Sequence, residues 1–241
     1  PVFPLDWQDP ATGERSSGYR ERGYFPEAFI NMLALLGWNP GTDQEVMSLE
    51  ELTALFDLER VHKGGARFDP EKARWFNQQY LRQQPDAELG AQLQQLLATK
   101  GIASTGEKAV AAAALLKERA TFAADMLEGE YLFTTGSPLE HNREAVDELQ
   151  KRWKPGTAAA LATFIAKVGA ITVADAPAFE QAFNQALEEH GLKMGQLMPA
   201  YRLCVAGRMQ GPGMFDVSAI LGRDEVLSRL ETGLKTGSTW G

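Results

Sequence analysis

Side chains capable of acid–base, nucleophilic or metal chemistry are scattered along this chain of 241 residues. The three histidines, His62, His141 and His190, lie far apart, and none has a second His or Cys at the spacing of a metal ligand. The single cysteine, Cys204, has apolar neighbours, which is typical of a buried small side chain rather than of a nucleophile. The sequence also lacks the phosphate-binding glycine loops and the His-Glu-x-x-His zinc motif. We therefore expect no catalytic residue and no metal ligand here, but a chain that binds or positions a partner.

One stretch, residues 199–215, combines the residue types that unstacked RNA bases require. It holds a turn rich in Gly and Pro, two arginines (Arg202 and Arg208), and Met214 and Phe215 directly after the turn. Free backbone groups hydrogen-bond to base edges, while a guanidinium plane or a flat apolar side chain stacks on a base. From composition alone, a plain helix–turn–helix corner is the simpler interpretation of the same glycines and prolines.

The composition is that of an ordinary globular chain with an acidic balance. Hydrophobic residues make up 44% and charged residues 23%, and 24 Lys and Arg against 32 Asp and Glu give a net charge of −8. This mixture excludes a disordered chain, and a single cysteine excludes an internal disulfide and favours a reducing compartment. No apolar run reaches the roughly 18 residues of a membrane span, so we expect no membrane contact. The acidic charge argues against a nucleic-acid binder, which is usually basic.

Helical periodicity runs through most of the sequence and supplies the elements that hold these residues. Pro26 begins a predicted helix that ends at Gly37. Ser48 and Glu51 form a predicted capping box, in which each side chain satisfies a backbone N–H of the other residue. The expected buried stripe of the first helix is Phe29, Ile30, Leu33 and Leu36, and that of the second is Leu52, Leu55 and Phe56. The other expected helix starts are at Asp69, Asp86, Ser104, Ser137 and Asp175.

The predicted fold class is all-α, built as successive small helical bundles with a short extended segment at Pro1–Trp7. In the last third, helices are expected to end at Gly169 and Gly191, and Gly222 divides the final two. The expected boundaries between domains are Gln84-Pro85 and Pro155-Gly156. These boundaries divide the chain into residues 1–84, 85–155 and 156–241.

Two outer blocks of the sequence resemble the C-terminal half of bacterial glutamyl-tRNA synthetases, which are class I aminoacyl-tRNA synthetases. The C-terminal block is Arg202-Leu203 through Gly207, Gly211-Pro212-Gly213-Met214-Phe215, Leu221-Gly222 and Arg229-Leu230. The N-terminal block is Gly18-Tyr19-Arg20-Glu21, Gly23-Tyr24-Phe25-Pro26-Glu27-Ala28, Asn31 and Leu33-Ala34-Leu35-Leu36-Gly37-Trp38, followed by Phe68-Asp69 and Trp75-Phe76-Asn77. The resemblance spans nearly the whole chain in the right order.

The family's His-x-Gly-His element and its Lys-Met-Ser-Lys-type loop are absent from this sequence. The match begins just after the place of that loop, and Pro1 begins the sequence without an initiator Met, so we expect a piece of a longer protein. The resemblance implies a glutamate–tRNA ligase, which attaches glutamate to its tRNA using ATP, without its catalytic domain. ATP and Mg would bind to that absent domain, so no cofactor is expected in this chain, and the chain alone is expected to be inactive.

The resemblance also implies roles for individual residues. Residues 1–84 would be a stem-contact fold, followed by two helical anticodon-binding domains, 85–155 and 156–241. Arg202 would read the first anticodon base, and Gly211, Pro212 and Met214 would offer backbone groups and an apolar platform to the first and second bases. Many relatives carry Thr or Ser where this chain has Gly211, so only a backbone contact is expected there. Arg119 would read the third base, although a solvated helix end explains this arginine equally well.

Four basic residues of the N-terminal block are expected to contact the tRNA backbone: Arg20, Arg22, Lys63 and Arg67. A solvated loop around Gly64 and Gly65 is the simpler interpretation of Lys63 and Arg67. The implied partner is glutamate tRNA, bound by a cytoplasmic monomer. Two other interpretations stay open: an acidic helical module that binds proteins and not RNA, and an enzyme whose site has no recognisable pattern.

Overall fold

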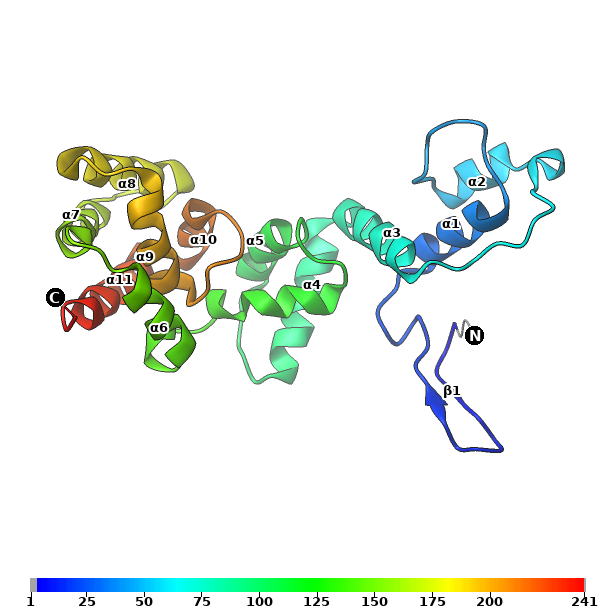
Figure 1. Cartoon of the computed structure of the whole chain (residues 1–241), viewed down its shortest axis with the longest axis horizontal. Helices are drawn as coiled ribbons and strands as arrows, with labels where there is room; N and C mark the ends of the chain where they lie inside the picture. Colours follow the sequence, from blue (N-terminus) through cyan, green and yellow to red (C-terminus); the bar gives the residue numbers. More distant parts are fainter. Residues whose placement is uncertain (1–3, 241) are drawn as a thin grey trace.

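The computed structural model describes residues 4–240, which form a helical chain drawn out along one axis (Figure 1). The all-α prediction is confirmed, and the 3-10 helices are labelled η. In chain order, the elements are β1 (Trp7–Gln8), β2 (Arg15–Ser16), α1 (Pro26–Gly37), α2 (Leu49–Leu55), η1 (Leu58–Arg60), α3 (Pro70–Gln83), α4 (Asp86–Thr99), α5 (Gly106–Leu116), η2 (Ala123–Leu132), η3 (Pro138–Glu140), α6 (Arg143–Arg152), α7 (Thr157–Gly169), α8 (Ala176–His190), α9 (Met194–Ala206), α10 (Met214–Leu221) and α11 (Arg223–Gly237).

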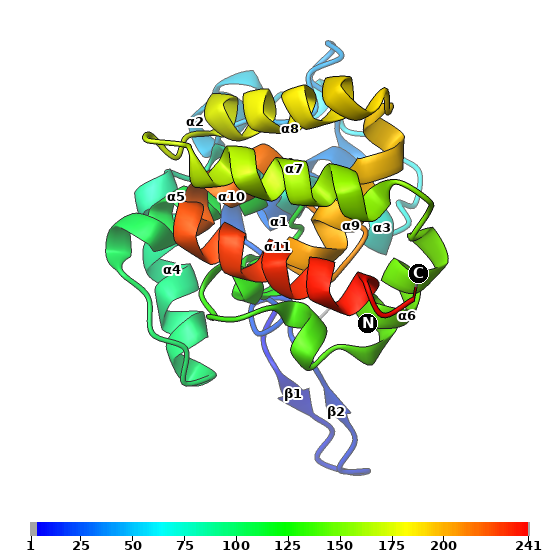
Figure 2. The same ribbon diagram turned by 90° about the vertical axis from the view of Figure 1, so that its left-hand side faces the viewer.

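The expected extended segment lies partly outside the described residues, because Pro1–Phe3 are not among them. Within the described part, β1 pairs with β2 in an antiparallel hairpin, with Trp7 opposite Ser16. This hairpin projects away from the helices in both views (Figures 1 and 2). Gly18 closes its base, where its N–H donates to the Asp6 carboxylate at 2.7 Å.

The first helical unit packs α1 against α3. The expected stripe on α1 is wrong in part: the side chains of Ile30 and Leu33 are 42% and 41% exposed, whereas Asn31 and Met32 are buried. The polar Asn31 tolerates burial because its Oδ1 accepts hydrogen bonds from Met47 N at 2.9 Å and from the Tyr80 hydroxyl at 3.0 Å. These two bonds fix which face of α1 turns inward.

The stripe expected on α2 is also wrong in part. Leu52 is buried, but Leu55 and Phe56 are exposed. Phe56 lies at the end of the helix, where its ring meets the Trp38 ring with a centroid separation of 5.9 Å. A helix of seven residues therefore buries one turn against α1 and leaves its last turn at the surface.

Helix starts follow the sequence where the cap is local. The capping box of Ser48 and Glu51 is confirmed, as are the caps at Asp69 and Asp175. Two predictions are wrong by position. Asp86 lies inside the first turn of α4, and Thr105 rather than Ser104 caps α5. Ser137 is a cap, as expected, but the helix that it caps is the short 3-10 helix η3, and a second cap, Asn142, precedes α6.

A single continuous core runs from Leu81 through α4, α5, η2 and the later helices to Leu230. In Figure 2, α7 lies between α8 and α11, and contacts within the chain join α7 to both. Helix α6 and η3 pack against α9, so residues on both sides of the expected boundary at Pro155-Gly156 share this core. The division of the chain at that point stays a prediction.

The junction after α3 is held by side chains on both of its sides. Asn77 accepts from Phe25 N at 2.8 Å through Oδ1 and donates to Thr121 O at 2.6 Å through Nδ2. Arg82 of α3 donates to Glu118 O at 2.6 Å, and Lys117 Nζ donates to Gln84 O at 3.1 Å. The first helical unit is thus fastened to the end of α5 by hydrogen bonds as well as by chain continuity.

No helix within residues 4–240 is long and apolar enough to cross a membrane.

Candidate nucleic-acid interface

Residues 207–213 form the turn between α9 and α10, and its conformation depends on glycine. Gly207 ends α9 with a φ of +66°, and Gly211 has a φ of +141°. Side chains disfavour both conformations, because a Cβ would clash with the local backbone. The Gly207 carbonyl accepts a hydrogen bond from Asn142 Nδ2 at 3.1 Å, so α6 holds the start of the turn.

Arg202 reaches from α9 to the other end of this turn. Its Nη2 donates to the Pro212 carbonyl at 2.9 Å. Its Nη1 is buried and has no hydrogen-bond partner among the described residues. A Cβ at Gly211 would lie 3.5 Å from this Nη1, so the glycine keeps the space in front of it open. Burial lowers the pKa of the Arg202 guanidinium, which nevertheless stays charged at neutral pH.

A cavity of about 260 Å³ separates the turn from α5 and η2. It brings together three of the predicted residues, Arg119, Gly211 and Pro212. The Arg119 side chain is exposed and, in the part of the chain that the structure describes, makes no hydrogen bond or ion pair. The cavity therefore has an unpaired guanidinium at one wall and free backbone of the glycine turn at the other.

Met214 does not lie on this surface. Its side chain is 2% exposed because Met214 is the first residue of α10 and packs into the core. Its carbonyl accepts from the Tyr201 hydroxyl at 3.4 Å. In this conformation the Met214 side chain offers no platform to a base, and Pro212 is also buried.

Among the residues of the cavity wall that were not predicted as contacts are Tyr131, Glu128 and Arg208. Burial raises the pKa of the Tyr131 hydroxyl. Arg208 crosses from the turn to η2, where its Nη1 donates to Glu128 O at 2.9 Å and its Nη2 to Glu128 Oε2 at 2.7 Å. No motif marks Tyr131 or Glu128, because they meet the turn only through folding. Arg208 was visible as the second arginine of the turn.

Arg229 of α11 lies in the core beside the cavity and hydrogen-bonds to the segments that form it. It is 0% exposed, and its Nε donates to the Glu225 carboxylate at 2.7 Å. Its two Nη atoms donate to three carbonyls at the C-terminal ends of α9 and η2: Val205 O at 2.7 Å, Tyr131 O at 3.0 Å and Thr134 O, just past η2, at 2.6 Å. This arginine, which belongs to the C-terminal block of the sequence, is a structural residue and is not available to RNA.

The predicted backbone contacts lie in the first helical unit, separated from the turn by α4 and α5 (Figure 1). The Arg22 guanidinium lies over the Tyr19 and Tyr24 rings, 5.2 and 5.7 Å from their centroids. Arg20 is exposed, and its Nε lies 3.9 Å from Glu21. Lys63 and Arg67 are exposed and make no ion pair with any described residue.

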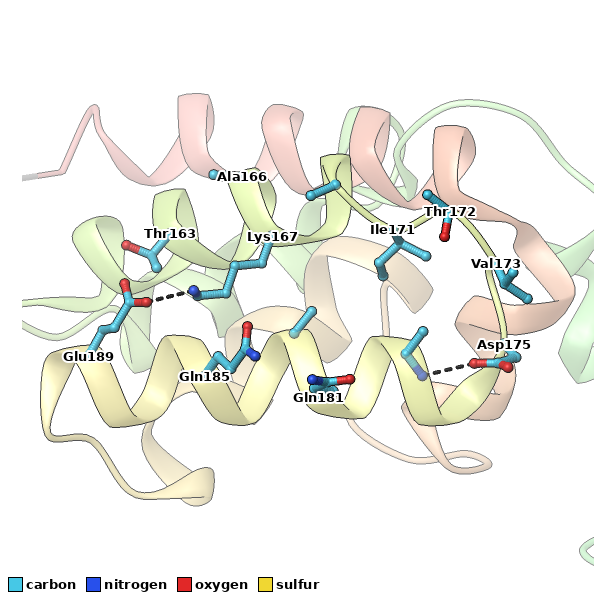
Figure 3. A pocket seen from close by; sticks show the side chains of 13 residues that line it. Thr163, Ala166, Lys167, Ile171, Thr172, Val173, Asp175, Gln181, Gln185 and Glu189 are labelled. Carbon is cyan, nitrogen blue, oxygen red and sulfur yellow. Dashed lines mark hydrogen bonds and ion pairs between the residues drawn. The ribbon is translucent and has the colours of Figure 1, made fainter.

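A larger hollow, of about 760 Å³, is a groove between α7 and α8 (Figure 3). An ion pair between Lys167 and Glu189 spans it at 2.6 Å. None of the predicted contact residues lines it, so size does not select the site. Across residues 4–240, no group of three or more His, Cys, Asp or Glu side chains could hold a metal ion.

Two family models match the chain. Residues 74–234 match the model of the anticodon binding domain, and residues 11–75 match part of the model of the catalytic domain of class I tRNA synthetases (E and Q).

Relatives agree with these matches. The chain is 42% identical over 235 residues to a glutamate–tRNA ligase of Porphyromonas gingivalis and 43% identical over 230 residues to one of Phocaeicola vulgatus. The alignments cover 98% and 95% of this chain but 46% and 45% of the relatives, so the chain spans about half of their length. A solved glutamate tRNA ligase of Elizabethkingia meningosepticum superposes with a TM-score of 0.85 at 38% identity, covering 98% of this chain and 46% of that one.

Proposed function

We propose that this chain, which belongs to the anticodon-binding domain family, is the tRNA-recognition part of a glutamate–tRNA ligase. The observation that carries the proposal is the cavity beside the turn 207–213. Beside Gly211, which lines the cavity, Arg202 carries a buried N–H group without a partner among the described residues, and Arg119 contributes an unpaired guanidinium to the cavity wall. A buried donor without a partner costs free energy, and a ligand that accepts its hydrogen bond recovers that cost. The acceptor edge of an unstacked base is such a ligand.

In this proposal, Arg202 reads the first anticodon base and the backbone of Gly211 and Pro212 the second. Arg119 reads the third base from the opposite wall. Met214 contributes through the position of α10 rather than by stacking, because its side chain lies in the core. These contacts are few and local, and a local site with two arginines is compatible with the overall net charge of −8.

The backbone contacts are proposed for Arg20, Arg22, Lys63 and Arg67 in the stem-contact fold, residues 1–84. Residues 85–155 and 156–241 are proposed as the two anticodon-binding domains. The chain supplies recognition and no bond-forming step, so ATP and the acceptor end of the tRNA would bind outside it. Because its partner is a tRNA of protein synthesis, we propose that the chain acts in the cytoplasm, as a monomer.

The test is a binding titration with glutamate tRNA and with versions that carry one substituted anticodon base. We expect tighter binding of the unchanged tRNA, and Arg202→Ala should weaken that binding by about 1–3 kcal/mol. Lys167→Ala, in the groove between α7 and α8, is the matched control and should bind like the parent chain. Equal binding of all the tRNAs by the parent chain would contradict the proposal and favour an acidic protein-interaction module.

A further inference from the structure

The cavity between the turn 207–213 and η2, which we call the base cavity, has two walls that are far apart in the sequence. One is the 3-10 helix η2 (Ala123–Leu132), and the other is the turn 207–213. Arg208 is the residue of the turn that crosses to η2. Its two Nη atoms bind two acceptors of the same residue, Glu128, one on the backbone and one on the side chain. Since a guanidinium is a rigid planar fork, two such bonds fix its orientation as well as its position.

The two ends of this wall are held by different arginines. Arg229, buried in the core, binds the carbonyls of Tyr131 and Thr134 at the C-terminal end of η2. Arg208 binds Glu128 one turn earlier, at the surface, where the two side chains are 37% and 68% exposed. The distance between η2 and the turn therefore depends on the pair of Arg208 and Glu128 on the solvent side of the cavity.

The charges of the cavity separate this pair from the proposed readers. The Arg119 guanidinium, which lines the cavity, and the buried Nη1 of Arg202 beside it have no hydrogen-bond partner within the described chain. Both Nη atoms of Arg208 already have acceptors, and the Glu128 carboxylate neutralises its charge. Arg208 is thus arranged to hold the wall and not to bind the base.

We propose that Arg208 and Glu128 are a positioning pair that sets the width of the base cavity and thereby its selectivity for the anticodon. This inference rests on the proposed function of the cavity. A cavity held at one width admits a base that fits it and excludes a base that does not. The opposite possibility is that Arg208 contacts RNA and Glu128 only restrains it.

The two possibilities predict different changes in tRNA binding for Glu128→Gln. A positioning pair loses its ion pair, so the ratio between the dissociation constants of the third-base-substituted and the unchanged glutamate tRNA should fall about 1.4- to fivefold, as expected for about 0.2–1 kcal/mol. If Arg208 contacts RNA, removing a carboxylate frees a positive charge, and both tRNAs should bind more tightly at an unchanged ratio.

The experiment measures both dissociation constants for the parent chain, Glu128→Gln, Arg208→Glu, Glu128→Arg and the double variant Arg208→Glu with Glu128→Arg. The exchanged pair should recover part of the ratio that each single variant loses. Glu130→Gln is the matched control: Glu130 lies in the same 3-10 helix and pairs with Lys100 at 2.5 Å, but it does not line the cavity. Its ratio should equal that of the parent chain.

Circular dichroism and thermal unfolding of each variant establish that it is folded, and Glu128→Gln, which keeps the side-chain shape, remains informative if a charge reversal does not fold. A parent chain that discriminates, together with a Glu128→Gln ratio equal to the parent's, overturns the positioning role alone. A parent chain that does not discriminate between the two tRNAs overturns the proposed function.

Discussion

Two glycine-containing loops carry arginine or lysine, and they differ in almost every other respect. The turn 207–213 is held by Asn142 at its start and by Arg202 near its end, and Arg208 fastens it to η2. The loop around Gly64 and Gly65 lies in open space: residues 61–67 are all exposed, and no atom comes within 4 Å of a Cβ built at either glycine.

The difference shows that the same residue types serve two kinds of recognition. Specific reading of a base requires donors held at one geometry, which the turn provides through its fixed backbone. Neutralising phosphates requires only charge at the surface, which a solvated loop with Lys63 and Arg67 provides. We expect the first region to respond to changes of shape and the second to respond to salt.

The largest effect should come from removing the arginine beneath the turn. Arg229→Met removes the donor of three carbonyls and leaves the partly buried Glu225 carboxylate with the Gly136 N–H as its remaining donor, which should lower the free energy of unfolding by about 3–5 kcal/mol. Urea unfolding followed by circular dichroism measures it. Arg67→Ala, in the exposed loop, is the control and should stay within about 0.5 kcal/mol of the parent chain. A comparable loss in both variants would remove the distinction between the regions.

Alkaline pH should weaken the core beneath the turn and leave the loop unaffected. Burial raises the pKa of the Cys204 thiol from 9.0 to about 12 and also raises that of Tyr201. Above pH 9 the unfolded chain loses the thiol proton that the folded chain retains, so the free energy of unfolding should fall by about 1.4 kcal/mol per pH unit for Cys204 alone, until pH reaches its folded-state pKa.

Denaturant titrations at pH 8, 9 and 10 follow this loss, and Cys204→Ala is the control variant. It should be less stable at every pH because of the cavity that it leaves, but its stability should fall less steeply above pH 9. A slope identical to that of the parent chain would show that Cys204 does not titrate in this way.

Exchanging the glycines compares the two loops directly. Gly211→Ala forces a side chain into a φ of +141°, which should lower the free energy of unfolding by about 1–3 kcal/mol and weaken binding of glutamate tRNA. Gly65→Ala meets no atom and has no positive φ, so stability should change by less than about 0.5 kcal/mol. Equal effects on stability would mean that the turn is no more constrained than the loop.

The smallest change in affinity should come from Lys63→Ala. Loss of one phosphate contact should reduce the slope of log Kd against log salt concentration by about 1 while leaving the preference among anticodon bases unchanged. Titrations of glutamate tRNA at several salt concentrations measure the slope. An unchanged slope would assign Lys63 to a solvated loop without RNA contact.

Local signals in the sequence predicted local structure well. Ser48 with Glu51, and the caps at Asp69 and Asp175, were correct because a cap depends on residues within one turn of it. The division at Gly222 followed in the same way, whereas α9 continues past Arg202, where the sequence had been expected to end it, to Ala206. Where two neighbouring residues can each cap a helix, the sequence does not select between them, and the cap of α5 is Thr105 rather than the expected Ser104.

Features that depend on distant partners could not be predicted. Which face of α1 is buried is decided by Asn31, whose acceptor serves Met47 and Tyr80. The cavity itself needs η2 beside the turn, and nothing near Tyr131 or Glu128 in the sequence indicates that contact. Arg119 and Arg202 could be chosen by resemblance, but the burial of Met214 and the internal role of Arg229 required the folded chain.

The bonds from Arg229 to Thr134 and Tyr131 join residues 95 and 98 positions apart. During synthesis, residues 85–132 leave the ribosome long before Arg229 does, so α4 and α5 form while η2 still lacks its anchor. The cavity is therefore completed among the last features of the chain, and it closes over a long loop whose entropy must be lost first. A nascent chain whose α11 has not yet left the ribosome already contains the arginines proposed to read RNA, but it lacks the wall that positions them.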